Sequence, residues 1–290
     1  YQMPLKTEGN KHLLFGRTVN YGGDIQLIAG TYGNRKSAYS KGIFLARIDE
    51  AGNQEIRYYN YGDLGNFFKY LKAKREQRIQ DRIARRKILG KKIRFNYRFI
   101  VHEIVPHNDQ FVLLGEAFYP KYVQMDNRFS SSFFYNTTAP GGFYTQNGRI
   151  FDGYRYTHAV VIGFDGKGHL LWDNSFEIND VKTFTLEQFV KINAHEDRIA
   201  LLYLFQNEIR SKIIERNNVV EGKTVEPIRT FREAAAFRRG RPENSKSRMD
   251  YWYPGFFYAY GVQHIPVEGS EERRVFYVNK ITYSDEAEGR

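Results

Sequence analysis

The stretch "HAVVIGFDGKGHLLWDNSF", residues 158–176, consists of an apolar run, a turn signal and a second run that contains a tryptophan. In the turn, Asp165 can accept backbone hydrogen bonds through its carboxylate, and Gly168 can adopt a positive φ without steric cost. The stretch "KGIFLARIDEAGNQEIRYYNY", residues 41–61, has the same order of features, with strands expected at 43–48 and 55–61 around a turn at 49–53. Both stretches predict β-hairpins, and their likeness indicates a repeated unit.

The repeat extends beyond these hairpins. Asp24, Asp109 and Asp197 lie 85 and 88 residues apart, and each comes just before a run typical of a buried strand. The runs are "LIAG" from residue 27, "VLLG" from residue 112 and "ALLY" from residue 200. A weaker hairpin at 211–228 completes the third copy, and 255–283 forms part of a fourth. We expect the apolar positions of the three runs, together with Tyr58 and Trp172, to be buried.

The predicted fold is all-β and mainly antiparallel, with β-propeller-type four-stranded blades in a single domain over residues 1–290. Four-stranded units in a fixed order are typical of propeller blades. A sandwich is the alternative, but it does not require its strands to repeat as units. Propellers have about 4–8 blades, whereas the sequence accounts for about three and a half. We therefore expect either an incomplete ring or a chain that begins within a longer protein, and Tyr1 in place of Met fits a removed export signal or upstream segment.

The residues "DGKGHLLW", Asp165 to Trp172, resemble the turn-and-tryptophan signature of quinoprotein-type propeller blades, with one residue fewer between Asp and Gly. The stretches "LLGEAFYPKY", "GYRYTHAVVIGFDGKGHLLWDNSF" and "RRVFYVNKI" are similar to uncharacterised β-propeller-like repeat proteins of Bacteroidota cell envelopes. This resemblance covers most of residues 13–283. It implies a propeller-like fold and an exported location, in the periplasm or cell envelope, but it brings no known activity.

One unit is interrupted by a segment that predicts a basic helix over 67–90. The segment has no proline and consists mainly of good helix formers. Asn66 is expected to cap its start and Gly90 its end. The residues expected to form an apolar stripe against the sheets are Phe68, Leu71, Ile79, Ile83 and Ile88.

The positive charge of the chain is concentrated in two places. The net charge of the chain is +11. Residues 69–94 carry twelve Lys or Arg and two acidic residues, a net of +10, and residues 229–248 carry seven Lys or Arg and two acidic residues, a net of +5. The rest of the chain therefore has a net charge of −4. The basic helix is therefore expected to bind an anionic partner, either an acidic protein or an envelope surface of lipid or lipopolysaccharide phosphate. The expected binding residues are Arg78, Arg82, Arg85 and Arg86. Charge that serves solubility alone is the alternative, and nucleic acid is disfavoured because no aromatic residue lies between Lys72 and Arg94.

A second interruption, 119–156, is rich in aromatic residues, Gly, Ser and Asn. Long loops of this kind commonly carry function. Phe133, Phe134, Tyr135 and Tyr144 are expected to form a contact surface, because rigid aromatic rings offer large contact areas at low entropic cost. The alternative is that these rings cover a sheet edge.

The sequence contains no catalytic constellation that can be recognised from spacing. The absence of cysteine excludes thiolate metal sites, disulfides and cysteine nucleophiles. His102 and His107 lie five apart in a strand pattern, which places them on opposite faces, so no zinc site is expected there. Glu116 could act as an acid that faces a central channel, and His158 reads as a core or edge histidine. No metal and no cofactor are expected.

Taken together, the sequence predicts a non-catalytic interaction module of the bacterial cell envelope. The alternative is a propeller-fold carbohydrate-active hydrolase or lyase that uses Glu116 and an unidentified partner residue. No apolar run approaches the ~20 residues of a membrane span.

Overall fold

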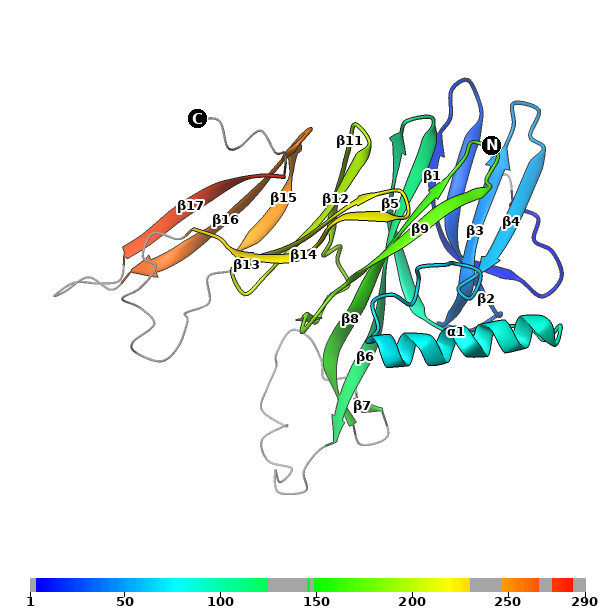
Figure 1. Cartoon of the computed structure of the whole chain (residues 1–290), viewed down its shortest axis with the longest axis horizontal. Helices are drawn as coiled ribbons and strands as arrows, with labels where there is room; N and C mark the ends of the chain where they lie inside the picture. Colours follow the sequence, from blue (N-terminus) through cyan, green and yellow to red (C-terminus); the bar gives the residue numbers. More distant parts are fainter. Residues whose placement is uncertain (1–3, 125–144, 147–148, 230–246, 266–272, 284–290) are drawn as a thin grey trace.

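The computed structural model describes residues 4–124, 145–146, 149–229, 247–265 and 273–283. Within these residues the chain forms strands and a single α-helix, and the strands make four antiparallel sheets (Figure 1). The mainly antiparallel, all-β prediction is therefore confirmed.

Each sheet is built from consecutive strands. The first contains β1 (His12–Asn20), β2 (Gln26–Gly33), β3 (Ser40–Ile48) and β4 (Gln54–Asn60) in that order. The second contains β5 (Arg98–His107), β6 (Gln110–Gln124), β8 (Arg149–Phe164) and β9 (Leu170–Glu177), and the short strands β7 (Thr145–Gln146) and β10 (Lys182–Thr183) pair with β8. The third contains β11 (Lys191–His195), β12 (Arg198–Phe205), β13 (Glu208–Glu215) and β14 (Asn218–Pro227). The fourth contains β15 (Arg248–Tyr253), β16 (Phe256–Ile265) and β17 (Arg273–Thr282).

The predicted hairpins are present as β3–β4 and β8–β9. In the second hairpin the Asp165 carboxylate accepts hydrogen bonds from the amides of Lys167 and His169, at 2.9 and 2.8 Å, and Gly168 adopts a φ of +76°. The three regularly spaced aspartates each come just before the second strand of a sheet, β2, β6 or β12. Corresponding aspartates therefore precede corresponding strands of the first three sheets.

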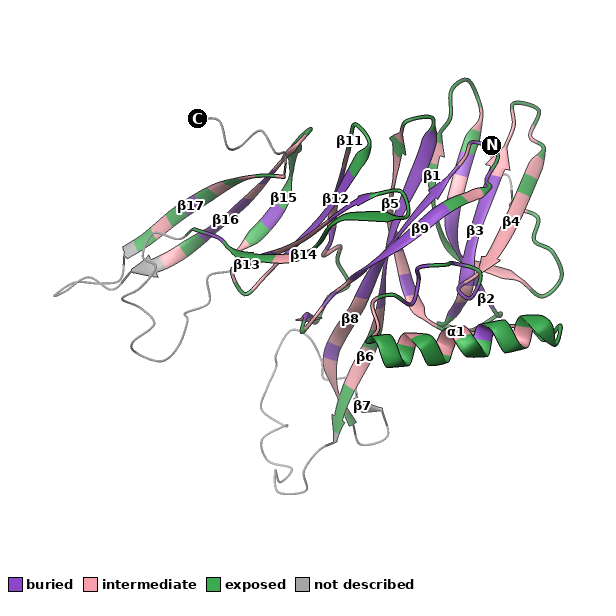
Figure 2. Ribbon diagram, in the orientation of Figure 1, coloured by how far each residue is buried: buried purple, intermediate pink, exposed green. Residues whose placement is uncertain are grey.

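The sheets stack in chain order, and a hydrophobic core fills each space between neighbours. Successive side chains of a strand point to opposite faces, so Leu113 packs toward the first sheet and Leu114 toward the third. Leu201 and Leu202 divide in the same way between the second and fourth sheets. Because the middle strands are buried on both faces, as Figure 2 shows, they read as continuous apolar runs.

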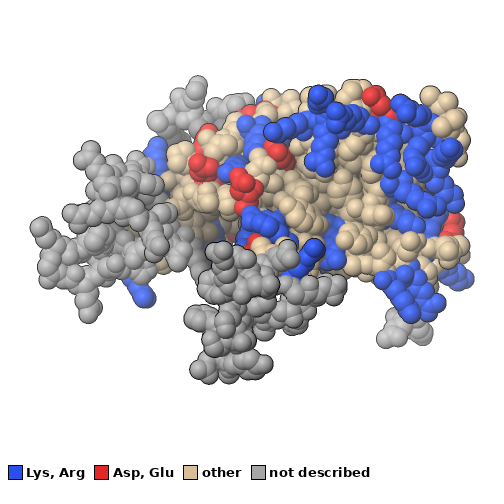
Figure 3. All heavy atoms as spheres, turned by 90° about the horizontal axis from the view of Figure 1, so that it is seen from below, with Lys and Arg blue, Asp and Glu red and all other residues tan. Residues whose placement is uncertain are grey.

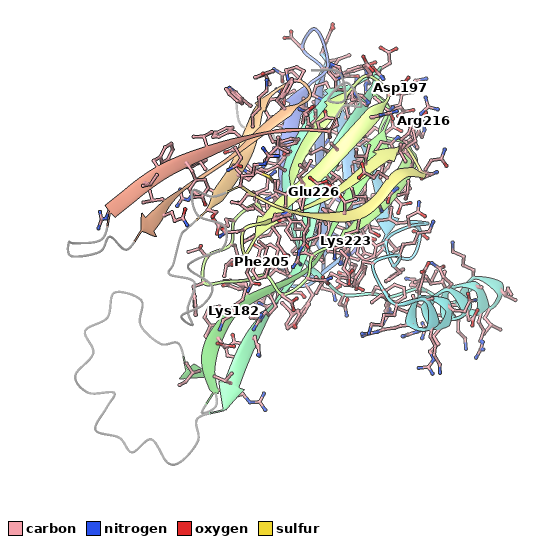
Figure 4. All side chains as sticks on the ribbon, turned by 60° about the vertical axis from the view of Figure 1, so that its left-hand side comes forward. Lys182, Asp197, Phe205, Arg216, Lys223 and Glu226 are labelled. Carbon is pink, nitrogen blue, oxygen red and sulfur yellow. The ribbon has the colours of Figure 1, made fainter. Side chains whose placement is uncertain are left out.

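The first and fourth sheets lie at opposite ends of the row in Figure 1, and no described strand of one pairs with a strand of the other. The described residues therefore form an open row of sheets. The outer strand of the third sheet, β14, is almost entirely exposed and carries charged side chains such as Lys223 and Glu226, labelled in Figure 4. Charges on an edge strand oppose pairing with other chains.

Besides the three apolar runs, Trp172 and Tyr58 were predicted to be buried, and only Trp172 is. Trp172 is buried, and its indole N–H donates to Oε1 of Gln110 at 2.7 Å. It lies over Gly163, where an added Cβ would approach the ring to 2.2 Å. Tyr58 is only half-buried, so that prediction was wrong. The reason is that Tyr58 lies on β4, the outer edge strand of the first sheet, with the ammonium of Lys11 over its ring at 3.9 Å.

The helix α1 (Ala73–Ile88) is shorter than the predicted 67–90. Its N-cap residue is Lys72, whose side chain makes no capping bond, so the capping role predicted for Asn66 was wrong. Its C-terminal end is as predicted, because Gly90 has a φ of +61° and its amide donates to the carbonyl of Lys87 at 3.1 Å. The amide of Lys91 also donates to the carbonyl of Arg86 at 2.9 Å. These two bonds form a Schellman motif that ends the helix sharply.

The apolar stripe is also shorter than predicted. Phe68 and Leu71 precede the helix, and Ile79 and Ile83 pack against the core between the first and second sheets. Ile88 is 85% exposed. It follows Ile83 by five residues, which turns it about 140° around the helix axis and away from the sheets.

The second interruption is narrower than the predicted 119–156. Strand β6 continues to Gln124 and β8 begins at Arg149, so both ends of the expected loop are strand. Phe133, Phe134, Tyr135 and Tyr144 lie outside the described residues.

Candidate anion-binding surface

The segment that leads into α1, residues 61–71, carries several fully buried side chains and is called the anchor segment below. Tyr61, Leu64, Phe67 and Phe68 are each 2% exposed or less. Their rings and methyl groups join the core between the first two sheets. The anchor segment is therefore part of the core although it has no regular secondary structure.

Asp173 on β9 fixes the anchor segment by hydrogen bonds. Its carboxylate accepts from the amides of Gly65 and Asn66, at 2.8 and 2.7 Å. The side-chain amide of Asn66 donates to the Asp173 carbonyl at 2.6 Å, and the hydroxyl of Ser175 donates to the Asn66 carbonyl at 2.9 Å. Burial raises the pKa of Asp173, and the amide donors oppose that rise. This network explains why Asn66 does not cap the helix.

The residues that follow α1 are fixed as well. Tyr97 and Ser40 exchange backbone hydrogen bonds of 3.0 and 2.8 Å, which join the segment to β3. The ring of Phe95 lies 4.7 Å from that of Phe68. Because both of its ends are held, α1 has a defined place at the edge of the molecule, where Figure 4 shows it beside the sheets.

The four predicted arginines of α1 come together. Arg78, Arg82, Arg85 and Arg86 are spaced so that they share one side of the helix. With Asp81, Leu89 and Lys91 they line a shallow hollow of about 440 Å³. Figure 3 shows a dense group of basic side chains at the end of the molecule where α1 lies. We call Arg78, Arg82, Arg85, Arg86 and Lys91 the arginine surface.

No ion pair among the described residues neutralises the positive charge of this surface. Within the part of the chain that the structure describes, no Lys or Arg of α1 lies within 4.0 Å of a carboxylate oxygen. The carboxylate of Asp81 instead accepts a hydrogen bond from the side-chain amide of Gln77 at 2.8 Å. The guanidinium of Arg86 donates to the backbone carbonyl of Lys92 at 2.9 Å. Guanidinium groups present planar forks of donors that match carboxylate, sulfate and phosphate oxygens. The surface can therefore bind an anion with several oxygens.

A second, polar hollow of about 370 Å³ lies where the first strands of three sheets approach one another. Its charged lining comes from Glu103 on β5, Lys191 on β11 and Asp250 on β15. Lys191 pairs with Asp250 at 3.1 Å, and Gln188 donates to Glu103 at 2.6 Å. No sequence motif indicated this hollow, because its residues come from three separate units.

Glu116 does not face a channel, so that part of the predicted alternative was wrong. It is fully buried, and its carboxylate accepts from the amides of Val190 and Phe189 at 2.6 and 3.1 Å. Its other oxygen lies 2.7 Å from Nε2 of His102. Glu116 thus ties the second sheet to the segment before the third.

His158 is the core histidine that the sequence predicted. It is fully buried, stacks on Tyr70 at 3.7 Å between ring centroids, and shares a 2.9 Å hydrogen bond between Nδ1 and the hydroxyl of Thr157. Burial lowers the pKa of His158 to about 3, so the ring is neutral.

Among the described residues, no group of three or more His, Asp or Glu residues is arranged to hold a metal ion. No helix in this part of the chain has both the length and the apolar composition needed to cross a membrane.

No family model matches the sequence, and no curated protein matches it. Among solved structures, the chain is similar to the polysaccharide lyase Uly1, with a TM-score of 0.34 and 12% identity over 92% of this chain and 45% of that one. It is also similar to RS223-β-xylosidase, with a TM-score of 0.22 and 7% identity over 95% of this chain and 94% of that one. The chain thus spans about half the length of the lyase. These likenesses show no sequence family and no link to Bacteroidota envelope proteins.

Proposed function

We propose that this chain is an attachment module of propeller-type β-sheets in the bacterial cell envelope, and that α1 binds it to an extended anionic surface. The observation that carries the proposal is the arginine surface, where four guanidinium groups and Lys91 line one hollow and no ion pair within the described protein neutralises them. Like charges four residues apart destabilise a helix by a few tenths of a kcal/mol. An external polyanion would relieve that repulsion.

A carbohydrate-active hydrolase or lyase is the second hypothesis, and its acid would be a carboxylate other than Glu116. Glu116 is fully occupied by backbone amides and His102. Glu103 and Asp250 line the polar hollow, but each already has a protein partner. The hollow therefore supports catalysis less strongly than the arginine surface supports attachment.

The first prediction tests the arginine surface with the variant R78Q/R82Q/R85Q/R86Q. Glutamine keeps helix propensity within a few tenths of a kcal/mol per residue, and Ile79 and Ile83 remain. We expect the variant to elute from immobilised heparin at a clearly lower salt concentration than the parent, because each lost contact reduces the release of counterions. Circular dichroism and thermal unfolding should be nearly unchanged, since three of these side chains are exposed and Arg86 is only half-buried.

A matched control removes the same charge elsewhere. Lys6, Arg17, Arg35 and Lys36 are exposed on the first sheet and its flanking segments. The variant K6Q/R17Q/R35Q/K36Q should elute close to the parent. If both variants shift equally, the charge acts only through the net total and the attachment proposal is wrong.

A further inference from the structure

The C-terminal end of α1 carries two exposed apolar side chains. Ile88 is 85% exposed and Leu89 is 56% exposed. Both come directly before Gly90, whose positive φ and hydrogen bond to Lys87 fix the end of the helix. The pair therefore occupies a defined position rather than a fraying terminus.

These apolar residues are surrounded by cations. Leu89 lines the same hollow as Arg82, Arg85, Arg86 and Lys91. Lys87 and Lys92 are exposed on either side in the chain. The combination of a bulky apolar pair and unneutralised cations at one place is the composition of a membrane-surface contact.

We propose that α1 docks by its C-terminal end on an anionic lipid bilayer. Ile88 and Leu89 enter the boundary between head groups and acyl chains, and the arginine surface binds lipid phosphates. This inference rests on the proposed function, because it names the anionic surface that α1 would bind.

Docking by the end of the helix also follows from the packing of α1. An amphipathic helix that lies flat on a bilayer directs its whole apolar face to the lipid. Here Ile79 and Ile83 already pack against the core between the first two sheets. The apolar side chains left for the bilayer are those at the last turn and the C-cap.

A soluble polyanion or an acidic protein is the less suitable partner. A sulfated or phosphorylated polymer satisfies the cations, but it offers no apolar medium for Ile88 and Leu89. A bilayer of anionic lipid offers both phosphate oxygens and an apolar interior within reach of the same helix end.

The test compares two probes with the full chain and three variants. The probes are vesicles of equal parts phosphatidylglycerol and phosphatidylcholine, measured by co-sedimentation, and immobilised heparin, measured by elution salt. The apolar variant is I88S/L89S, the charge variant is R78Q/R82Q/R85Q/R86Q, and the control is V219S/V220S, which changes a neighbouring pair of half-exposed valines on β14. Circular dichroism verifies the fold of each protein.

We expect I88S/L89S to lose about tenfold in vesicle affinity and to elute from heparin with the parent. The control should match the parent on both probes, and pure phosphatidylcholine vesicles should not bind. If I88S/L89S binds vesicles as well as the parent, or if the parent binds heparin but not the anionic vesicles, the lipid inference is wrong. If the charge variant keeps parent-like retention on heparin, the proposed function itself is wrong.

Discussion

The anchor segment and α1 are neighbours in one insertion, but they are built in opposite ways. In the anchor segment, the rings of Phe67 and Phe68 are fully buried. In α1, Ile83 is the one buried residue. The comparison shows that the anchor segment positions the helix and that the outer side of the helix is free to bind. Stability and attachment should therefore respond to different substitutions.

Contacts explain the difference. The ring centroid of Phe67 lies 4.6 Å from that of Tyr61, 5.0 Å from those of Phe68 and Tyr97, and 4.9 Å from that of His158. Ile79 and Ile83 contribute the apolar contacts of α1 with the same core. A large side chain in a close-packed site cannot be removed without a cavity, whereas a surface side chain can.

The largest expected effect is that of Phe67→Ala. Loss of a fully buried phenylalanine should lower the free energy of unfolding by about 3–5 kcal/mol. Urea unfolding followed by circular dichroism would measure it. The control is Phe276→Ala on β17, where the side chain is 63% exposed, so its effect should stay within about 0.5 kcal/mol. Equal effects would show that the anchor segment is not part of the core.

The next effect is a dependence of the free energy of unfolding on pH. It comes from His158, which stacks on Tyr70 of the anchor segment. Burial lowers the pKa of His158 to about 3, while the unfolded chain binds the proton near pH 6.5. The unfolded state therefore binds more protons between these two pH values. The contribution of the neutral His158 ring to the free energy of unfolding is complete above pH 6.5 and is lost as the pH falls toward 3.

The measurement compares the parent with His158→Gln, which cannot titrate. Between pH 6.5 and pH 5 the parent should lose about 1.6 kcal/mol more than the variant. Thermal or urea unfolding across that range gives the two curves. Parallel curves would mean that folding does not lower the pKa of His158.

The smallest effect is expected at the end of α1. Gly90 has a φ of +61°, and an added Cβ would meet nothing within 4 Å. Gly90→Ala should therefore cost only the backbone strain of the left-handed conformation, about 1 kcal/mol. Gly222→Ala on β14 is the control, since that site also has open space but no positive φ, and it should leave the melting temperature unchanged. A loss at Gly222 as large as at Gly90 would contradict the strain argument.

Much of the fold could be predicted from the sequence because its signals are local. The hairpin β8–β9 follows from Asp165 and Gly168, which determine the turn within a few residues. The C-terminal end of α1 follows from Gly90 for the same reason. Four of the five residues of the arginine surface were predicted from the concentration of positive charge in the helical segment, and the helix itself brings them together on one side.

Other features depended on contacts between distant parts of the chain. The sequence around Asn66 has the composition of a helix start, but Asp173, 107 positions later, binds its backbone amide and removes it from that role. From the sequence, Glu116 was expected to be a free acid. In the structure its carboxylate accepts a hydrogen bond from the amide of Val190, which lies 74 positions later. The polar hollow needs residues from β5, β11 and β15, and no short stretch contains them.

The sequence by itself therefore determined the repeated antiparallel unit, the basic helix and the side of the helix on which its arginines lie. Turn chemistry and helical periodicity act over a few residues, so they can be read directly. The tertiary structure decided which apolar residues of the insertion are buried. Ile83 packs against the core and Ile88 does not, because the anchor segment and the segment after α1 fix how the helix is rotated against the sheets.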